Sequence, residues 1–343
     1  MKPGALLIRA DANVTIGTGH VMRCLALAQA WQESGGVTSL AAAELPEMLS
    51  PRLATERIAV IRLDVTPGSL GDAADTIAHA HQLSAEWVAI DGDRFQSDFL
   101  EAIRNADLKL LLIDDFADRE SFPTDLVVNP NPGADVEVYR KRGFTASVLT
   151  GTPYVMLRRE FRQPFQSREF REKGNRILVT LGGSDPEELT PRIAVALAEC
   201  GDLEITAVAG PGYSKLGSLR AFEAPNLRVV FDSQDMVELM RSSDVAIIAA
   251  GGTLWELLSV GCAVLSYSRN AVQARVVRDL ANRGAVLDMG DTRSFDPAKL
   301  RDSVNGLAGA RASRERMATL GRALVDGLGA TRVVEAMRRS GAC

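Results

Sequence analysis

A histidine near the start of the chain stands where acid–base chemistry could take place. His20 directly follows Gly17-Thr18-Gly19, and the apolar run from Ala5 to Ile8 before this turn predicts a buried strand. A helical pattern begins near Gly19, so His20 is predicted at a helix start, where unpaired N–H groups and the helix dipole favour anions. An imidazole titrates at about pH 6.5. The sequence therefore predicts a proton acceptor beside an anion site.

Two later turns repeat the order of strand, glycines and helix. They read Gly182-Gly183-Ser184-Asp185-Pro186 and Gly251-Gly252-Thr253. Glycine lets the backbone approach a ligand closely, and a helix start offers N–H groups to phosphate oxygens. The Walker lysine pattern is absent, and GxGxxG does not follow the first strand. A diphosphate bound without a metal therefore fits better than triphosphate hydrolysis or dinucleotide binding. Each glycine turn alone is also common at the ends of strands and helices that bind no ligand.

Acidic residues follow two of the predicted strands. Asp91 comes after the run Trp87–Ile90, and Asp114-Asp115 comes after Leu108–Ile113. Ligands of open α/β sheets bind at the carboxyl ends of strands, so these carboxylates could line a cleft. Turn and helix-cap roles are the alternative. For Glu256 two interpretations have equal weight, a hydrogen bond to ribose hydroxyls and a capping interaction at the start of its helix.

The composition argues against several classes of protein. The 343 residues carry a net charge of −5, so we expect no nucleic-acid partner. No apolar run reaches the roughly 18 residues of a membrane span and no signal peptide is evident, so we expect no membrane span. The 4 cysteines lie far apart, and the 3 histidines lack the spacing of metal ligands. We therefore expect reduced thiols, a cytoplasmic location, no metal and no cofactor.

Short apolar runs alternate with helical patterns along the whole chain. Strands are predicted over residues 5–8, 38–42, 58–63, 87–90, 108–113, 126–128, within 145–155, and over 177–181, 204–209, 227–231, 245–249 and 263–267. Helices are predicted over residues 20–34, 73–83, 95–106 and from about 185 to 200. The region from Pro297 onward is also predicted to be helical, with breaks at Gly306, Gly309, Gly321 and Gly327. This alternation predicts an α/β fold with mostly parallel sheets covered by helices on both faces.

A polar stretch from Arg162 to Gly174 is the best candidate for a linker. It divides the chain into an N-terminal domain of residues 1–165, which we expect to bind the sugar of a ligand and carry the catalytic groups, and a C-terminal nucleotide-binding domain of residues 175–343. In this division the C-terminal helices are free to pack back on the N-terminal domain.

Several of these motifs together resemble a known family. The runs Arg9-Ala10-Asp11 and Ile16-Gly17-Thr18-Gly19-His20-Val21-Met22-Arg23-Cys24-Leu25 are similar to the opening of the UDP-2,4-diacetamido-2,4,6-trideoxy-β-L-altropyranose hydrolases of pseudaminic acid biosynthesis and of related spore-coat polysaccharide proteins. The likeness continues, in order and to about residue 285, through Asp114-Asp115, Asn129-Pro130-Asn131, Leu157-Arg158-Arg159-Glu160-Phe161, Leu181-Gly182-Gly183-Ser184-Asp185 and Ala250-Gly251-Gly252-Thr253-Leu254-Trp255-Glu256.

The resemblance implies a fold and a reaction. The fold is GT-B-like, with two Rossmann-like domains of mostly parallel sheets that face each other across a cleft, as in the MurG-type glycosyltransferases. The reaction is metal-independent hydrolysis at the anomeric carbon, which releases UDP and the free sugar. The sugar would face the N-terminal half, and UDP would lie mainly on the C-terminal half.

The resemblance also implies roles for single residues. His20 matches the proposed catalytic histidine, Glu256 the UDP-binding acid and Asn270 a cleft asparagine, and we expect Asp11 and Asn13 to orient the histidine or the sugar. The other residues expected to contact a UDP-sugar are Arg9, Gly17, Gly19, Asp91, Arg158, Gly182, Gly183, Ser184, Gly252, Thr253 and Gln273. The family's adjacent Asn-Gln is spread here over Asn270-Ala271-Val272-Gln273, which leaves a different nucleotide sugar open.

Three functions stay open on these residues. The leading one is a nucleotide-sugar hydrolase with His20 as general base. A glycosyltransferase on the same scaffold would pass the sugar to an acceptor other than water. A non-catalytic nucleotide-sugar-binding protein would not need the histidine. The sequence does not predict an oligomeric state, and a monomer is compatible with it.

Overall fold

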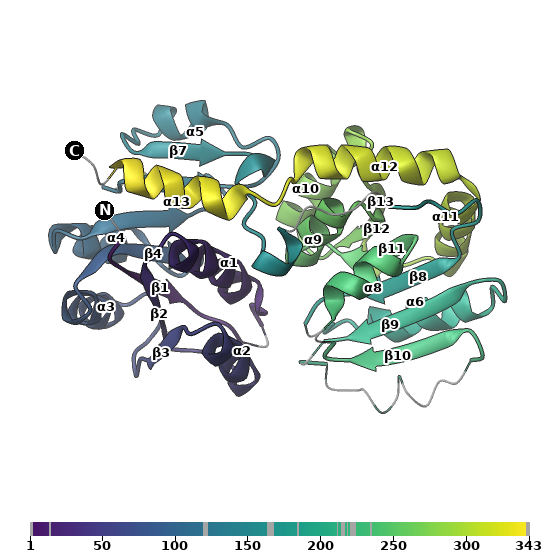
Figure 1. Cartoon of the computed structure of the whole chain (residues 1–343), viewed down its shortest axis with the longest axis horizontal. Helices are drawn as coiled ribbons and strands as arrows, with labels where there is room; N and C mark the ends of the chain where they lie inside the picture. The colour runs from purple at the N-terminus through teal and green to yellow at the C-terminus, as the bar shows by residue number, and fades with distance from the viewer. Residues whose placement is uncertain are drawn as a thin grey trace. The chain divides into compact units, whose positions relative to one another are not determined.

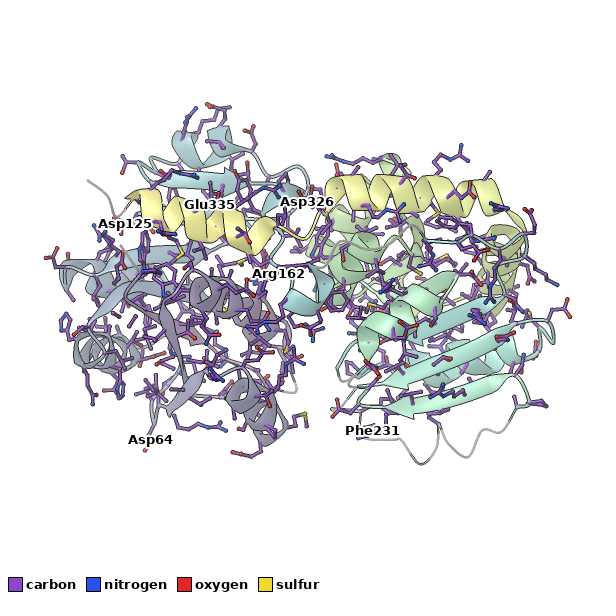
Figure 2. The ribbon with its side chains drawn as sticks, in the orientation of Figure 1. Asp64, Asp125, Arg162, Phe231, Asp326 and Glu335 are labelled. Atoms are coloured by element: carbon purple, nitrogen blue, oxygen red, sulfur yellow. The ribbon has the colours of Figure 1, made fainter. Side chains whose placement is uncertain are left out.

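The computed structural model describes residues 3–13, 15–118, 123–162, 168–183, 185–210, 212–213, 217, 219, 224–233 and 235–340. The chain divides into two units, of which the first comprises Met1–Arg162 and Gly327–Cys343 and the second comprises Gln163–Asp326. Arg162 and Asp326, labelled in Figure 2, are therefore the residues after which the chain passes from one unit to the other.

A seven-stranded parallel sheet forms the centre of the first unit in the residues that the structure describes. Its strands are β1 (Ala5–Ala10), β2 (Val37–Ala42), β3 (Ala59–Arg62), β4 (Ala85–Asp91), β5 (Lys109–Ile113), β6 (Leu126–Asn129) and β7 (Ser147–Thr150). They lie in the order β3-β2-β1-β4-β5-β6-β7, so the order reverses between β1 and β4. Open parallel sheets bind ligands at the carboxyl ends of strands beside such a reversal. Ala10 and Asp91, which end these two strands, are paired with each other.

Helices cover both faces of this sheet. They are α1 (Gly19–Glu33), α2 (Ser50–Thr55), α3 (Leu70–Gln82), α4 (Ser97–Asn105), α5 (Val136–Lys141) and α13 (Gly329–Ser340), with short 3-10 helices η1 (Glu47–Leu49), η2 (Thr152–Tyr154) and η3 (Arg159–Phe161). Leu6 and Ile8 of β1 pack in the same buried cluster as α1, whereas Leu7 packs in the cluster that includes Phe99 of α4. Alternate side chains of β1 thus enter opposite apolar layers, which is why the strand is apolar throughout.

The C-terminal helix α13 belongs to the first unit. Its buried residues include Ala330, Val333, Val334 and Met337, which share a cluster with α1. Figure 1 shows α13 (yellow) beside α1 (purple), although they lie at opposite ends of the chain. Helix α13 thus packs back on the first unit, as the predicted division allowed, and the second unit ends at Asp326 instead of residue 343.

The second unit has its own parallel sheet, six-stranded in the described residues. Its strands are β8 (Arg176–Thr180), β9 (Glu204–Ala209), β10 (Leu227–Phe231), β11 (Val245–Ala249), β12 (Ala263–Ser268) and β13 (Leu287–Asp291), in the order β10-β9-β8-β11-β12-β13. Its helices are α6 (Leu189–Ala198), α8 (Met236–Ser242), α9 (Gly252–Val260), α10 (Ala271–Asn282), α11 (Pro297–Gly309) and α12 (Arg311–Leu324), with the 3-10 helix η4 (Thr292–Ser294).

The predicted strands are confirmed, with ends that differ by a few residues, whereas β13 was not predicted. Two predicted helix breaks are wrong, because Gly306 lies inside α11 and Gly321 lies inside α12. A Cβ at Gly321 would lie 3.1 Å from atoms of Leu258 in α9, so this glycine allows two helices to approach closely. In the parts of the chain that the structure describes, no helix has the length and apolar character needed to cross a membrane.

Candidate active site

The carboxyl ends of β1 and β4 bring His20 and Asp91 together. His20 is the second residue of α1, which follows β1, and Asp91 is the last residue of β4. Nδ1 of His20 lies 2.7 Å from Oδ1 of Asp91. The Asp91 side chain is fully buried, whereas 23% of the His20 side chain is exposed. The imidazole therefore contacts a buried carboxylate through one ring nitrogen and reaches the surface of the unit.

Arg23 holds Asp91 in place. It lies one turn after His20 on the same face of α1, and it donates to both oxygens of Asp91, at 2.5 Å from Nε and 2.6 Å from NH2. Its two terminal nitrogens also lie 2.8 Å from oxygens of Asp115, in the loop after β5. Asn131 donates to the backbone carbonyl of Asp115. The guanidinium is thus clamped between two carboxylates, and this fixes Asp91 against His20.

The charges around His20 decide its tautomer. The negative charge of Asp91 raises the pKa of His20 above its usual value, while burial and the charge of Arg23 act against this shift. Burial would raise the pKa of Asp91, but Arg23 and His20 outweigh burial and hold this pKa far below its usual range. Asp91 is therefore ionised at neutral pH and accepts a hydrogen bond from the Nδ1–H group. When the ring is neutral, its Nε2 atom keeps a lone pair that can accept a proton.

A small recess lies beside this pair. It is lined by Asp11, Ile16, His20, Asp91, Gly92, Asp93, Arg94 and Phe95. The space open in it to the centre of a water molecule is about 10 Å³, close to the smallest volume that accommodates one water. Within the described residues, no group of three or more His, Cys, Asp or Glu side chains is placed to hold a metal ion.

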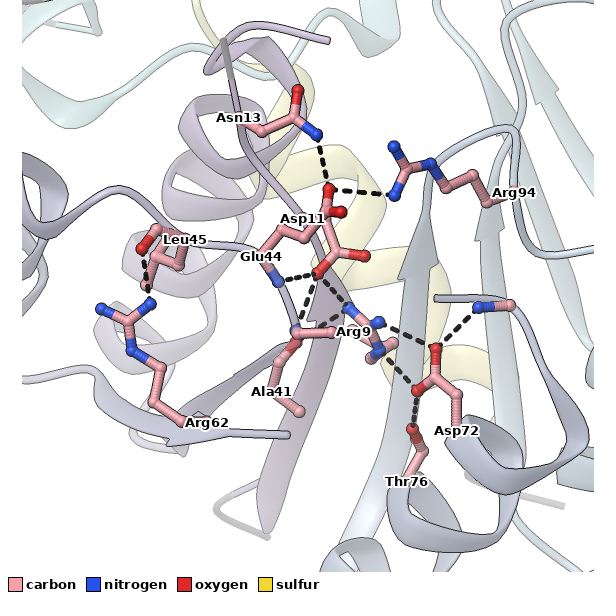
Figure 3. Close-up of polar contacts among 12 residues, drawn as sticks. Arg9, Asp11, Asn13, Ala41, Glu44, Leu45, Arg62, Asp72, Thr76 and Arg94 are labelled. Atoms are coloured by element: carbon pink, nitrogen blue, oxygen red, sulfur yellow. Dashed lines mark hydrogen bonds and ion pairs between the residues drawn. The ribbon is translucent and has the colours of Figure 1, made fainter. Parts of the chain in front are cut away.

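Asp11 is held beside the recess through one of its two oxygens. Oδ1 accepts hydrogen bonds from Arg9 at 2.7 Å and from the backbone N–H groups of Ala43 and Glu44 at 2.8 and 3.0 Å. Oδ2 is buried and has no hydrogen-bond partner among the described residues. Figure 3 shows this second oxygen pointing away from the donors that hold the first. Asp11 is thus fixed by one oxygen and offers the other as an acceptor.

Arg9 supports Asp11 from inside the core. Its guanidinium donates twice to Asp72 of α3 at 2.8 Å, and it lies 4.9 Å from the ring centre of Phe95. The side chain is 0% exposed. A guanidinium in this position does not reach a ligand, which corrects the expectation that Arg9 contacts the substrate. Its role is to position Asp11.

The turn before α1 contains three further predicted residues. Asn13 accepts hydrogen bonds from the two backbone N–H groups of residues 15 and 16, and it donates to Glu44, so its side chain shapes the turn. Gly17 has a φ of +74°, which favours glycine, and its N–H donates to the carbonyl of Asn13. A Cβ at Gly19 would meet no atom within 4 Å, so the backbone at the start of α1 is open.

The residue that orients His20 is Asp91, through the hydrogen bond to Nδ1. Asp11 was expected to orient either the histidine or the sugar, and its role towards the sugar stays a prediction. Arg158 forms an ion pair with Glu160 at 2.9 Å and lies over the ring of Phe161. Its predicted contact with the substrate stays a prediction.

The glycine pair Gly182-Gly183 does not lead directly into a helix, as the predicted order of strand, glycines and helix requires. The helix after it, α6, begins only at Leu189. The carboxylate of Asp185 accepts hydrogen bonds from the first N–H groups of α6, at 3.2 and 2.7 Å, so the chain itself caps this helix. A Cβ at Gly210 would lie 2.5 Å from Gly183, so these glycines allow two loops to pack closely. Ser184, also predicted to bind the substrate, lies outside the described residues.

The third glycine turn, Gly251-Gly252-Thr253, has the predicted order of strand, glycines and helix. Helix α9 begins at Gly252, the second glycine of the pair, and its N-cap residue Gly251 provides no side-chain cap. A Cβ at Gly251 or Gly252 would meet no atom within 4 Å. Thr253 is the second residue of α9. Glu256 is its fifth residue, beyond the first turn, which contains no acid. Both interpretations of Glu256, a contact with a ribose and a capping interaction, stay predictions.

Asn270 and Gln273 act together at the start of α10. Oδ1 of Asn270 accepts a hydrogen bond from the N–H of Gln273 at 2.9 Å, and Oε1 of Gln273 accepts one from the N–H of Arg269 at 2.8 Å. The spacing of three residues is therefore that of a reciprocal helix cap. Because both oxygens are used in this way, the amide nitrogens are the groups left to meet a ligand.

Sequence comparison finds relatives of low identity, and no protein-family model matches the chain. The chain is 26% identical to the UDP-2,4-diacetamido-2,4,6-trideoxy-β-L-altropyranose hydrolase of Campylobacter jejuni over 284 residues, 81% of this chain and 97% of that protein. It is 26% identical to the spore coat polysaccharide biosynthesis protein SpsG of Bacillus subtilis, over 66% of this chain and 68% of that protein. A match of 26% to an uncharacterized protein of Methanocaldococcus jannaschii covers 80% of this chain and only 57% of that protein.

Solved structures with the same fold include two chains of nearly equal length. MurG of Acinetobacter baumannii has a TM-score of 0.68 at 20% identity, over 98% of this chain and 99% of that chain. A putative UDP-N-acetylglucosamine 2-epimerase from Listeria monocytogenes has a TM-score of 0.72 at 15% identity, over 100% of this chain and 97% of that chain. At such identities the likeness shows the fold alone. The chain has the GT-B fold, and its sequence resembles the family of the UDP-2,4-diacetamido-2,4,6-trideoxy-β-L-altropyranose hydrolases.

Proposed function

We propose that this chain hydrolyses a nucleotide sugar, with His20 as the general base. The observation that carries the proposal is the contact of 2.7 Å between Nδ1 of His20 and Oδ1 of the buried Asp91. With Nδ1 held by Asp91, Nε2 is the ring nitrogen left to accept a proton, and His20 lines a recess with room for a water molecule. The sequence likeness to a UDP-sugar hydrolase supports UDP as the nucleotide and the anomeric carbon as the site of attack.

The reaction follows from this geometry. Nε2 of His20 takes one proton from water while the water oxygen forms a bond to the anomeric carbon. The bond between that carbon and the phosphate oxygen breaks, and its electron pair leaves with the nucleoside diphosphate. Asp91 stabilises the imidazolium that forms, and Arg23 keeps Asp91 ionised and in place. The free sugar carries the hydroxyl from water, and His20 returns its proton to solvent.

We propose that the diphosphate binds at the start of α9. This helix has no side-chain cap, and its first residue is a glycine with open space around the missing Cβ. The N–H groups of such a helix start, the helix dipole and the hydroxyl of Thr253 suit phosphate oxygens. Glu256, one turn further, is proposed to bind the ribose hydroxyls. Neither role requires a metal.

The substitution Gly252→Ala separates binding from folding. Because a Cβ would meet no protein atom and alanine favours helix more than glycine does, the thermal midpoint should stay unchanged or rise. The affinity for UDP should fall by about tenfold or more, because the methyl group occupies the approach to the backbone. Isothermal titration with UDP checks this. Gly201→Ala, at another glycine with open space, is the control and should bind UDP normally; equal affinity of both variants would place the diphosphate elsewhere.

The pH dependence should report the charge on His20. Because Asp91 raises the pKa of His20, kcat/KM should rise with pH through an apparent pKa above about 6.5 and then level off. Below this pKa the ring is protonated and cannot accept a proton from water. A steady-state pH profile of sugar release measures it, and a rate that falls with increasing pH across this range would contradict a histidine base.

A transferase is the second candidate, because MurG shares the fold. The experiment that tests the proposal supplies UDP-2,4-diacetamido-2,4,6-trideoxy-β-L-altropyranose and a panel of UDP-, dTDP- and GDP-sugars without an acceptor, and follows UDP and free sugar by chromatography. Hydrolysis predicts stoichiometric release of both with at least one donor. A donor consumed only when an alcohol acceptor is added would favour the transferase. No turnover under either condition would favour a binding protein.

A further inference from the structure

One oxygen beside the recess is buried without a partner. Asp11 is 4% exposed, and its Oδ2 makes no hydrogen bond within the described residues. Its Oδ1 accepts three hydrogen bonds, so the carboxylate cannot turn without losing them. Asp11 and His20 line the same recess. A buried acceptor without a donor costs free energy, so a ligand group that donates a hydrogen bond there is favoured.

We propose that Oδ2 of Asp11 accepts the second hydrogen bond of the attacking water and thereby selects water over alcohols. This inference rests on hydrolysis as the proposed function. Water has two O–H groups: one gives its proton to Nε2 of His20, and the other donates to Asp11 without losing its proton. The oxygen lone pair is then directed at the anomeric carbon. The recess, which both side chains line, has room for the centre of a water molecule.

An alcohol does not meet these requirements. It has one O–H group, and this group must give its proton to His20 if the oxygen is to attack the anomeric carbon. Its carbon then lies against the carboxylate of Asp11, which is left without a donor in a buried position. Glycosyltransferases have the same fold, so the fold alone does not exclude transfer to an alcohol. In this chain, the two acceptors on one recess, Asp11 and His20, make that transfer unfavourable.

The wild-type protein tests this directly. The probe is methanol, added in increasing amounts to the reaction with the best donor of the panel, and the products are free sugar and methyl glycoside. The share of methyl glycoside should be roughly 5- to 100-fold below the mole fraction of methanol, the factor that corresponds to leaving a buried acceptor unpaired. A share equal to the mole fraction would overturn the inference while leaving hydrolysis intact.

The variant Asp11→Asn removes only the second acceptor. Three donors surround the Oδ1 position, so the amide oxygen takes that place and the NH2 group replaces Oδ2 in the recess. We expect kcat to fall by roughly 10- to 100-fold, as for a misplaced nucleophile, with KM nearly unchanged and the relative share of methyl glycoside increased. A merely structural role of Asp11 would not change the product ratio.

Asp125→Asn is the matched control. Asp125 also receives a backbone N–H, from Leu110 at 2.8 Å, and an arginine, Arg104 at 3.0 Å, but it precedes β6 at the other end of the strands. It should lose some stability and keep the wild-type kcat and product ratio. An Asp11→Asn protein with wild-type kcat and product ratio overturns the inference. If that variant does not fold, the methanol experiment alone tests the inference. A wild-type protein that releases no sugar refutes the proposed hydrolysis, which is a different outcome from failure of the inference on Asp11.

Discussion

Replacement of His20 by alanine should lower kcat for sugar release by roughly 10²- to 10⁴-fold, the usual contribution of a positioned general base. The fold should persist, because 23% of this side chain is exposed and α1 begins without a side-chain cap in which His20 takes part. Steady-state kinetics at pH 8 measure kcat, and circular dichroism with a thermal melt checks the fold. UDP should bind to the variant as it binds to the wild type.

The chain offers a matched control for this substitution. His79 lies on α3 and takes part in no contact with the His20–Asp91 pair, so His79→Ala should keep the wild-type kcat. The assignment of the base would be refuted by a folded His20→Ala protein with a kcat within a few-fold of wild type. The nucleophile would then be activated by another group.

Replacement of Asp91 by asparagine should lower kcat by up to roughly 10⁴-fold, as when the aspartate that fixes a catalytic histidine's tautomer becomes an asparagine. If the amide nitrogen faces Nδ1, it donates to this atom and forces the proton onto Nε2, which then cannot act as a base. If it faces Nε of Arg23 instead, two donors oppose each other in a buried position. Either arrangement should also lower the thermal midpoint.

The pH profile distinguishes the electrostatic role of Asp91 from a purely structural one. Asp91 raises the pKa of His20, whereas Arg23 lowers it and remains in the variant. The acidic limb of kcat/KM for Asp91→Asn should therefore move to lower pH. Asp75→Asn, at an exposed position of α3, should leave both the rate and the profile unchanged. A profile of Asp91→Asn that coincides with that of the wild type would show that the two side chains are not coupled.

Local patterns were sufficient to predict much of the framework. The apolar run before His20 and the glycines around it are local signals, and the structure confirms β1 and a helix that begins at Gly19. The contact of His20 with Asp91 could not be predicted in this way, because these residues are 71 positions apart. Their contact depends on β4 lying next to β1, and the order of strands in a sheet is not encoded in any one segment.

The same limit explains the residues that sequence reasoning missed. The prediction omitted Arg23 and assigned Arg9 to the substrate, although both are arginines close to His20. The available signal was the spacing of His20 and Arg23 by three residues, which places them on one helix face. The internal role of Arg9 depends on its ion pair with Asp72. The fold brings Asp72 from α3 to the face of β1 where Arg9 lies, so the sequence did not reveal this pair.

The second unit shows why glycine turns alone are ambiguous. Gly182-Gly183 and Gly251-Gly252 look alike in sequence, yet the first pair packs against Gly210 and precedes a helix capped by Asp185, whereas the second pair opens an uncapped helix. Whether a glycine serves internal packing or the approach of a ligand depends on the atoms around its missing Cβ. Only the folded structure supplies these neighbours.

The central claim is that water attacks the anomeric carbon of a nucleotide sugar, and the position of the broken bond tests it most directly. The donor is hydrolysed in water enriched in ¹⁸O, and the nucleotide product is analysed by mass spectrometry. Attack at carbon predicts UDP without ¹⁸O, because the bridging oxygen leaves with the phosphate. UDP that carries ¹⁸O, or UMP with a sugar phosphate as the products, would show attack at phosphorus and contradict the account.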